Sequence, residues 1–386
     1  MSALHRQVIK EKLISPTLFV KTEFEDVDLN ESKTDIDSES VCKLYNENMR
    51  MRRFDVKDLE SEGNEFVDKM GCEDFNTLWS GYFEKSLKIG PFQVYLTVPK
   101  LSETKEGTGM SFFIMHHGAG SCGLSFACLA KEITKITNGA CGVLSFDVRG
   151  HGISDEVLQN GLLDLRLEEL SKDFVKMVEL VCQNFGWDDI SEIVLVGHSI
   201  GGAVLTHVAK NQLLPNILGC AVLDIVEGSA INSFSTMMYH LLKRPKFFSS
   251  IREGIDWHLK NKILKNEQSA KVSIPLLFKR QISLNTGKNK WIWRVDLNET
   301  EPFWHGWLNG LSDCFLAIPS AKLLILSSKD RLDKTLMIAQ MQGKFQLLTF
   351  QNTGHFIHED LPELTAKALV SFWKRNQKSL ELSKRI

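Results

Sequence analysis

The chain has 386 residues, of which 43% are hydrophobic and 24% are charged, and its formal net charge at pH 7 is -2. These values are ordinary for a globular protein, and the small net charge gives no electrostatic sign of binding to nucleic acid or to an anionic membrane. No apolar run approaches the roughly 20 residues of a membrane-spanning helix, so we expect no membrane partner.

The eight cysteines are scattered along the chain and include no C-x-x-C pair. This spacing argues against a disulfide framework and against a metal site. Several of them lie in apolar runs, where a free cysteine behaves as a small hydrophobic residue. The first residues lack a long apolar core behind a basic start, so we expect no secretory signal. The cysteine usage therefore predicts a reducing compartment, the cytoplasm or the nucleus.

Residues 1–80 are predicted to be an N-terminal extension that is partly disordered. Between Glu23 and Glu39 this extension is acidic, contains serines and is low in aromatic residues, which is typical of a solvated tail. A docking segment or a segment regulated by phosphorylation is the alternative.

A regular pattern of strands and helices begins near residue 81. Phe83–Ile89 and Phe92–Val98 alternate between apolar and polar residues and are split by Gly-Pro, which predicts a hairpin. Further strands are predicted at Ser111–His116, Cys141–Phe146, Ile193–Val196, Cys220–Val226, Lys322–Ser327 and Phe345–Phe350, and helices at Leu124–Ile136, Leu167–Phe185 and Leu361–Trp373. The alternation predicts an α/β fold whose mostly parallel sheet has helices on both faces.

The alternation stops between residues 228 and 311. This stretch is rich in tryptophan and phenylalanine and has a helical pattern over Ile251–Leu264, but it has no strong buried strand. Because insertions gather on loops at the ligand end of such sheets, we expect a helical cap at 228–311 inserted into a core of 81–227 and 312–386. Its tryptophans either form a small core of the cap or present a surface to a lipid or a peptide.

The segment Gly197–Gly201 reads G-H-S-I-G and lies between a strand pattern and a helix pattern. In that context G-x-S-x-G predicts a nucleophile elbow, in which Ser199 stands on a tight turn above the edge of the sheet. The backbone N–H of Ile200 then lies at a helix N-terminus, where developing negative charge is stabilised.

A serine hydroxyl needs a neighbouring base and an acid that orients the base. His355 is the best candidate for the base, because it follows the last predicted strand and the expected chain order is Ser, acid, His. His358 competes with it, although a surface or cap contact suits that residue better. Asp224 and Asp330 both occupy the ends of predicted strands, at the edge where the elbow opens, and the sequence leaves the choice of acid open.

Small residues after the strand Ser111–His116 predict a second part of the oxyanion hole. The loop His117–Gly120 lets backbone N–H groups, those of Gly118 and Ala119, approach a substrate carbonyl together with the N–H of Ile200. A plain glycine turn is the alternative. Asp147 and His151 follow the next strand, and we expect them to brace the loop beside the elbow.

With these motifs in view, the chain resembles the α/β-hydrolase superfamily from about Tyr82 to Trp373. Less generic segments, DIVEG at Asp224–Gly228, KRPKF at Lys243–Phe247, WRVDL at Trp293–Leu297 and DRLDK at Asp330–Lys334, resemble the protein phosphatase methylesterase family. In that family the triad acid lies in the segment that corresponds to Asp224–Gly228, so the resemblance favours Asp224 over Asp330. The family has Met where Ile200 stands, which leaves the backbone donor unchanged.

The resemblance implies a serine carboxylesterase with the triad Ser199, Asp224 and His355, which needs no cofactor and no metal. It implies as substrate the methyl ester of the C-terminal leucine of the protein phosphatase 2A catalytic subunit, contacted through its tail and its body. We expect the cap to provide both contacts. Two alternatives are a broad serine esterase or lipase and a hydrolase-fold protein that binds the phosphatase without catalysis.

Overall fold

The computed structural model describes residues 78–100, 110–154, 158–159, 162–187, 190–282 and 289–383. The expectations for the N-terminal extension up to residue 77 lie outside this part of the chain. Within it, no helix combines the length and the apolar character that crossing a membrane requires.

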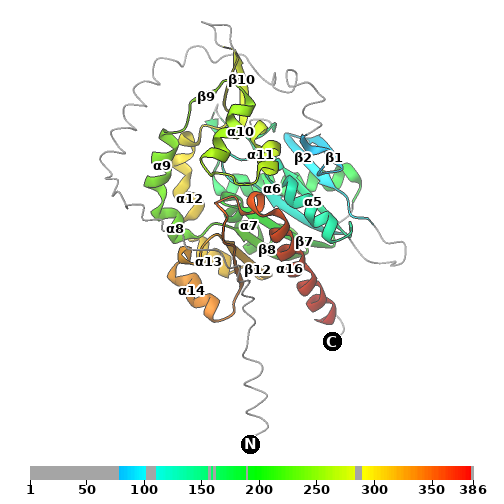
Figure 1. The fold of residues 1–386 in the computed structure, drawn as a ribbon. Helices are drawn as coiled ribbons and strands as arrows, with labels where there is room; N and C mark the ends of the chain where they lie inside the picture. The colour runs from blue at the N-terminus through cyan, green and yellow to red at the C-terminus, as the bar shows by residue number, and fades with distance from the viewer. Residues whose placement is uncertain are drawn as a thin grey trace, which may run out of the picture. The chain divides into compact units, whose positions relative to one another are not determined.

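An eight-stranded sheet forms the centre of the fold (Figure 1). In spatial order its strands are β1 (Lys85–Ile89), β2 (Phe92–Thr97), β4 (Cys141–Phe146), β3 (Ser111–His116), β7 (Glu192–His198), β8 (Ile217–Leu223), β12 (Ala321–Leu326) and β13 (Gln346–Thr349). The hairpin β1–β2 and the pair β2–β4 are antiparallel. All the other pairs are parallel, so the predicted sheet is confirmed.

Helices cover both faces of the sheet. The helices α6 (Leu167–Phe185), α7 (Ile200–Lys210) and α13 (Leu311–Leu316) share one apolar core with the sheet, and α5 (Ala127–Ile136) and α16 (Pro362–Ser383) share the other.

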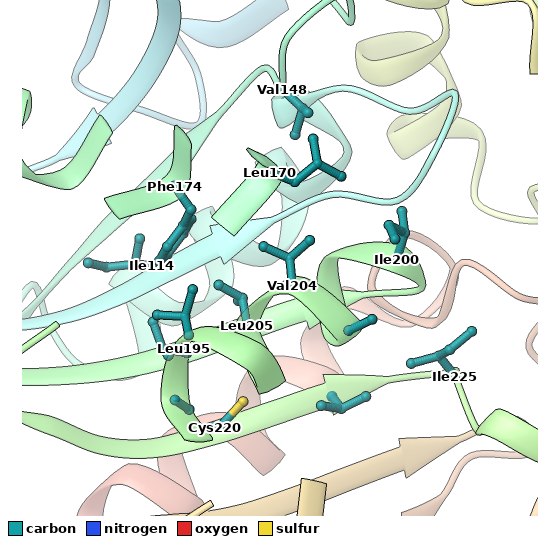
Figure 2. Close-up of a cluster of buried hydrophobic side chains, with 14 of the residues drawn as sticks. Ile114, Val148, Leu170, Phe174, Leu195, Ile200, Val204, Leu205, Cys220 and Ile225 are labelled. Atoms are coloured by element: carbon teal, nitrogen blue, oxygen red, sulfur yellow. The ribbon is translucent and has the colours of Figure 1, made fainter. Parts of the chain in front are cut away.

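The central strands β3, β4 and β7 are buried because helices cover both faces of the sheet and successive side chains point to opposite faces. In β7, Leu195 lies in the core beneath α6 and α7, whereas Val194 and Val196 lie in the core beneath α5 and α16. Figure 2 shows Leu195 close to Leu205 of α7. This packing explains why the sequence of β7 is an unbroken apolar run.

Strand boundaries differ from the prediction by up to three residues. The strand β8 begins at Ile217 and ends at Leu223, so Asp224 lies in the turn that follows and has a positive φ of 53°. Its backbone N–H donates to Ile325 O at 2.8 Å, which fixes this turn against β12. The acid candidate is therefore held outside the strand, at the carboxyl edge of the sheet.

The insertion between β8 and β12 combines helices with a small sheet of its own. Its helices include α8 (Glu227–Asn232), α9 (Phe234–Leu242), α10 (Ile251–Lys260), α11 (Glu267–Ser273) and α12 (Trp304–Leu308), and its antiparallel sheet has the order β10 (Phe278–Ile282), β11 (Asn289–Trp293), β9 (Phe247–Phe248). This small sheet was not predicted from the sequence, because its strands are short and present few buried positions.

The aromatic residues of the insertion belong mainly to apolar cores. The cap has its own cluster of buried residues, made of Phe248, Ile255, Leu264, Ala270, Ile274 and Phe278, and Trp257 and Trp293 pack against it. Trp304 and Trp307 are buried in the main core beneath α6 and α7. The cap is thus anchored on the hydrolase core by large apolar side chains.

Candidate active site

The nucleophile stands at the sharp turn between β7 and α7. Ser199 has φ 53° and ψ -127°, a conformation that costs a non-glycine residue on the order of 1–3 kcal/mol. The turn is held by the Ser199 N–H, which donates to Leu223 O at 3.0 Å, and by the Gly202 N–H, which donates to Ser199 O at 2.8 Å. Neighbouring backbone thus keeps this residue in the strained elbow.

The glycines of the motif are explained by the close approach of backbone on either side. A Cβ atom on Gly197 would lie 2.4 Å from Gly201 O, and one on Gly201 would lie 2.1 Å from His116 O. Neither distance is compatible with a side chain. The G-x-S-x-G pattern is therefore a requirement of the strand–turn–helix geometry.

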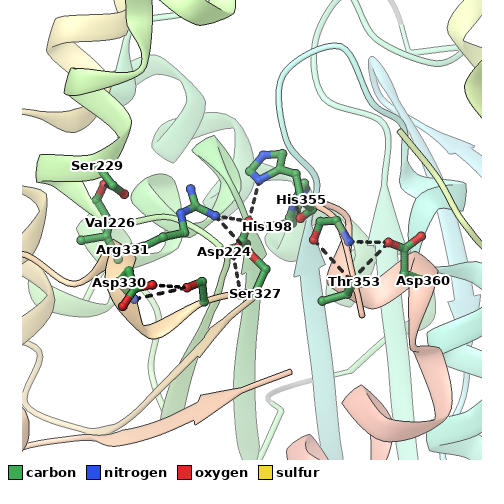
Figure 3. A network of polar contacts seen from close by, with 12 residues as sticks. His198, Asp224, Val226, Ser229, Ser327, Asp330, Arg331, Thr353, His355 and Asp360 are labelled. Carbon is green, nitrogen blue, oxygen red and sulfur yellow. Dashed lines mark hydrogen bonds and ion pairs between the residues drawn. The ribbon is translucent and has the colours of Figure 1, made fainter. Parts of the chain in front are cut away.

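Asp224 and His355 meet at the carboxyl edge of the sheet (Figure 3). His355 Nδ1–H donates to Asp224 Oδ2 at 2.9 Å, which leaves Nε2 as the proton-accepting atom of the imidazole. The backbone N–H and the hydroxyl of Ser327 both donate to Asp224 Oδ1 at 2.9 Å, and Arg331 Nη1 donates to Oδ2. The carboxylate is fully buried, and both of its oxygens accept hydrogen bonds from these groups.

Burial by itself would raise the pKa of Asp224, but its hydrogen bond to His355, with Arg331 and Ser327, holds that pKa below its ordinary value. The group is therefore a carboxylate at neutral pH. Asp330 is exposed instead and contacts its neighbour Ser328. The structure thus brings Asp224, and not Asp330, to His355.

His198 links the catalytic base to the elbow, and no role was predicted for it from the sequence. His198 precedes Ser199, and its Nε2–H donates to the backbone carbonyl of His355 at 2.9 Å. The two rings lie 4.6 Å apart between centroids. Burial lowers the pKa of His198 to about 3, so the ring is neutral and binds as a hydrogen-bond donor. Its position inside G-x-S-x-G was the available signal.

His358 is not the surface residue that its sequence position suggested. It is completely buried, and its ring centroid lies 4.5 Å from those of His198 and Phe126. Burial lowers its pKa well below the usual range for histidine. His358 therefore supports His198 from behind and is not positioned as an exposed base.

The predicted oxyanion loop lies directly against the nucleophile. A Cβ atom on Gly118 would come within 3.0 Å of the Ser199 Cβ atom and of His198 Nδ1. Ala119 follows Gly118 on the same loop, and Ile200 begins α7, so its N–H has no partner within the helix. Gly118, Ala119 and Ile200 line one small cavity next to the elbow, and the loop at Gly118 lies against Ser199.

The loop is braced by the polar residues that follow β4. His151 Nε2 accepts from the Gly120 N–H at 3.0 Å, and His117 Nε2 accepts from the Val148 N–H at 3.0 Å. Asp147 is buried and accepts from the N–H groups of Gly123, at 2.7 Å, and Ile153, at 2.9 Å. The bracing role predicted for Asp147 and His151 agrees with these contacts.

The loop that carries His355 is fastened to the cap by acidic side chains. Asp360 accepts from the Gly354 N–H and, at the same 2.7 Å distance, from the N–H of Lys265 in the cap. Glu359 accepts from the hydroxyl of Ser273, another cap residue, at 2.6 Å. The position of the catalytic base therefore depends on the insertion.

A cavity of about 190 Å³ is lined by residues of the oxyanion loop and of the cap. Ala119 and Gly120 line its core side, and Arg244, Trp257 and Leu297 line its cap side. A Cβ atom on Gly120 would lie 2.9 Å from Leu297 Cδ1, so the cap touches the loop directly. A bound chain end in this cavity would lie beside Ala119 and Gly120 of the predicted oxyanion loop.

The described part of the chain offers no grouping of side chains suited to a metal ion. The six cysteines within the described ranges are free. Across those same ranges, no three His, Cys, Asp or Glu side chains are grouped so that they could hold a metal ion.

Comparison of the sequence with known proteins identifies both a superfamily and close relatives. Residues 113–368 match the model of the alpha/beta hydrolase family. The chain is 48% identical to protein phosphatase methylesterase 1 of Aspergillus oryzae over 291 residues, which cover 74% of this chain and 66% of that protein. It is 44% identical to the same enzyme of Aspergillus fumigatus, covering 80% and 75%, and 39% identical to that of Schizosaccharomyces pombe, covering 78% and 85%.

Solved structures with the same fold are much more distant in sequence. The peroxisomal alpha-beta-hydrolase Lpx1 of Saccharomyces cerevisiae superposes with a TM-score of 0.56 at 14% identity, covering 75% of this chain and 82% of that one. E-2-(acetamidomethylene)succinate hydrolase superposes with a TM-score of 0.53 at 16% identity, covering 75% and 98%. At these identities the likeness concerns the fold alone.

Proposed function

The chain belongs to the protein phosphatase methylesterase family of α/β-hydrolases, and from this premise we propose that it removes the methyl ester from the C-terminal leucine of the protein phosphatase 2A catalytic subunit. The observation that carries the proposal is the contact of His355 with the buried carboxylate of Asp224 beside the Ser199 elbow. An ester needs such a nucleophile, base and acid for hydrolysis at neutral pH.

In the first half of the reaction Ser199 Oγ attacks the ester carbonyl carbon, and His355 Nε2 takes the hydroxyl proton. Asp224 holds the imidazole through Nδ1 and stabilises the imidazolium that forms. The carbonyl oxygen becomes an oxyanion, for which the N–H groups of Ile200 and of the loop at Gly118 and Ala119 are the available donors. The bond to the methoxy group then breaks, and methanol leaves with the proton from His355.

In the second half a water molecule attacks the acyl–serine carbonyl while His355 again takes a proton. Collapse of the second oxyanion releases the free carboxylate and returns the proton to Ser199. Neither half requires a redox change, and no group outside the named side chains and water enters the balance. The site of Ser199, Asp224 and His355 thus supplies every proton transfer that the reaction needs.

Two features support a protein rather than a small ester as the substrate. The cavity of about 190 Å³ beside Ala119 offers space for a flexible chain end. Exposed apolar side chains, which are common at interfaces when they cluster, lie on α14 (Lys334–Met341) at Met337, Ile338 and Met341 and on the cap at Met237 and Phe247. We propose that these surfaces meet the body of the phosphatase while its tail occupies the cavity.

The test uses methylated phosphatase 2A catalytic subunit and a leucine methyl ester peptide that matches its tail. Methanol release and the appearance of the free C-terminus are followed with the wild type and with Ser199→Ala. We expect the substitution to slow both reactions by about 10⁴- to 10⁶-fold, and intact phosphatase to be hydrolysed with a higher kcat/KM than the peptide. Persistence of the methyl ester with the wild type would refute the activity, and equal kcat/KM values would refute the docking surfaces.

A further inference from the structure

The cavity under the cap contains a positively charged side chain that the esterase mechanism does not use. Arg244 follows α9 and lines the cavity, and its guanidinium carbon lies 3.5 Å from the centroid of the Trp293 ring. Within the described residues, the guanidinium group makes no hydrogen bond and no ion pair, and Asp296 acts on it only electrostatically. A guanidinium that stacks on an aromatic ring keeps its N–H donors available for a planar anion.

The other titratable groups that line the cavity are uncharged at neutral pH. Burial raises the pKa of Glu359 to about 8 and lowers the pKa of His258 to about 4. Burial also lowers the pKa of Arg244 to about 10, against the effect of Asp296, so this side chain stays protonated. Among the groups lining the cavity, Arg244 alone therefore carries a charge near pH 7.

A single positive charge in a mostly apolar cavity favours one negative charge in the occupant. The walls are formed by Trp257, Leu297, Phe356 and other apolar residues, which exclude water and strengthen a charged pair. The ester group that reacts is neutral, so it gives Arg244 no partner. The negative charge must come from another part of the substrate.

We propose that Arg244 is a specificity-determining residue that binds the carboxylate of an acidic side chain located a few residues before the esterified terminus. This inference rests on the proposed function, because the cavity reaches Ala119 and Gly120 of the oxyanion loop and so adjoins the reacting ester. Trp293 holds the guanidinium in place, and the aromatic walls contact the neighbouring residues of the tail. The enzyme thus selects chain ends that combine an acidic residue with a terminal methyl ester.

The experiment uses hexapeptides that end in leucine methyl ester and carry one Asp at the second, third or fourth position from the end, each paired with its Asn counterpart. We expect the wild type to prefer Asp over Asn by roughly tenfold in kcat/KM at one of these positions. In Arg244→Gln this ratio should fall to about one, mainly through KM, and Arg244→Lys should restore part of it. Arg252→Gln is the matched control, because Arg252 is an exposed arginine of the cap whose partner is Asp256.

Three outcomes would overturn the proposal. The first is a wild type that hydrolyses all the peptide esters without an acidic preference. The second is a preference that survives in Arg244→Gln, even when the variant is slower on every peptide, since Arg244 would then only support cap packing. The third is a wild type without any Asp preference that free-acid peptides inhibit, while they do not inhibit Arg244→Gln. The guanidinium would then bind the carboxylate of the product. Failure of the wild type on every methyl ester would instead refute the proposed function.

Discussion

The carboxyl edge of the sheet and the cavity under the cap use charged residues in opposite ways. At the sheet edge the buried carboxylate of Asp224 is surrounded by donors from His355, Ser327 and Arg331. In the cavity the guanidinium of Arg244 rests on Trp293 without a hydrogen-bonding partner from the described chain. The first region is complete as it stands, whereas the second is completed by a ligand.

This difference assigns catalysis to the sheet edge and the choice of substrate to the cavity. A saturated network keeps the catalytic groups in one geometry, because each polar atom would lose a buried hydrogen bond if it moved. An unpaired cation in an apolar cavity gains its partner only when the substrate binds, so its contribution depends on which substrate enters. Substitutions at the sheet edge should therefore affect every ester, and those in the cavity should change the ranking of esters.

The largest effect is expected from removing the charge of the buried acid. Asp224→Asn should lower kcat on any ester by about 10⁴-fold, because the amide no longer stabilises the imidazolium and favours the wrong tautomer. Asp330→Asn, at the exposed candidate, should change kcat less than about twofold. Hydrolysis of a small methyl ester and of the methylated phosphatase would be measured for both variants. An inactive Asp330→Asn beside an active Asp224→Asn would reverse the assignment of the acid.

A smaller effect is expected at Arg331, which shares Asp224 Oδ2 with His355. Replacing the guanidinium in Arg331→Met removes the positive charge from Asp224 Oδ2 and leaves the carboxylate with His355 and the Ser327 donors, which favours the protonated imidazole. The acid limb of the kcat/KM–pH profile should move to higher pH by up to about one unit, while kcat on the alkaline plateau should change only a few-fold.

The matched control for that profile is Lys329→Met, an exposed neighbour on the same 3₁₀ turn, Lys329–Arg331. Its acid limb should coincide with that of the wild type. If Arg331→Met lowers activity by the same factor at every pH, Arg331 acts only as a structural support of Asp224, and the electrostatic part of the comparison fails.

The last effect concerns stability rather than turnover. In the folded protein burial raises the pKa of Glu359 to about 8, whereas the unfolded value is about 4.3. Between these values the folded state binds more protons, so the contribution of Glu359 to stability is present at low pH and is lost as pH rises toward 8. Wild type should therefore lose Tm relative to Glu359→Gln between about pH 5 and about pH 9.

The control for this measurement is Glu363→Gln, which removes an exposed carboxylate from an ion pair with Lys367 on α16. Its Tm difference from the wild type should be small. A Tm difference for Glu359→Gln that does not depend on pH would show that Glu359 is charged in the folded protein. Two charges of opposite sign would then line the cavity, and the cavity would no longer favour an anionic occupant.

Features set by neighbouring residues were predictable from the sequence, whereas contacts between distant segments were not. The elbow was predictable because the tight approach at Gly197 and Gly201 is a local requirement that five residues express. The choice between Asp224 and Asp330 was not, because β8 and β12 are neighbours in the sheet and both end at the same edge. The direction of each side chain depends on the turns that follow these strands, and the spacing of residues does not encode it.

The sequence by itself determined the alternation of strands and helices, the nucleophile and the family, since apolar periodicity and short motifs act over a few residues. Only the tertiary structure decided that Arg331 shares the carboxylate of Asp224, that His198 holds the loop of His355, and that Arg244 faces a cavity beside the oxyanion loop. Each of these contacts joins residues from separate elements, so it exists only after the sheet and the cap have packed together.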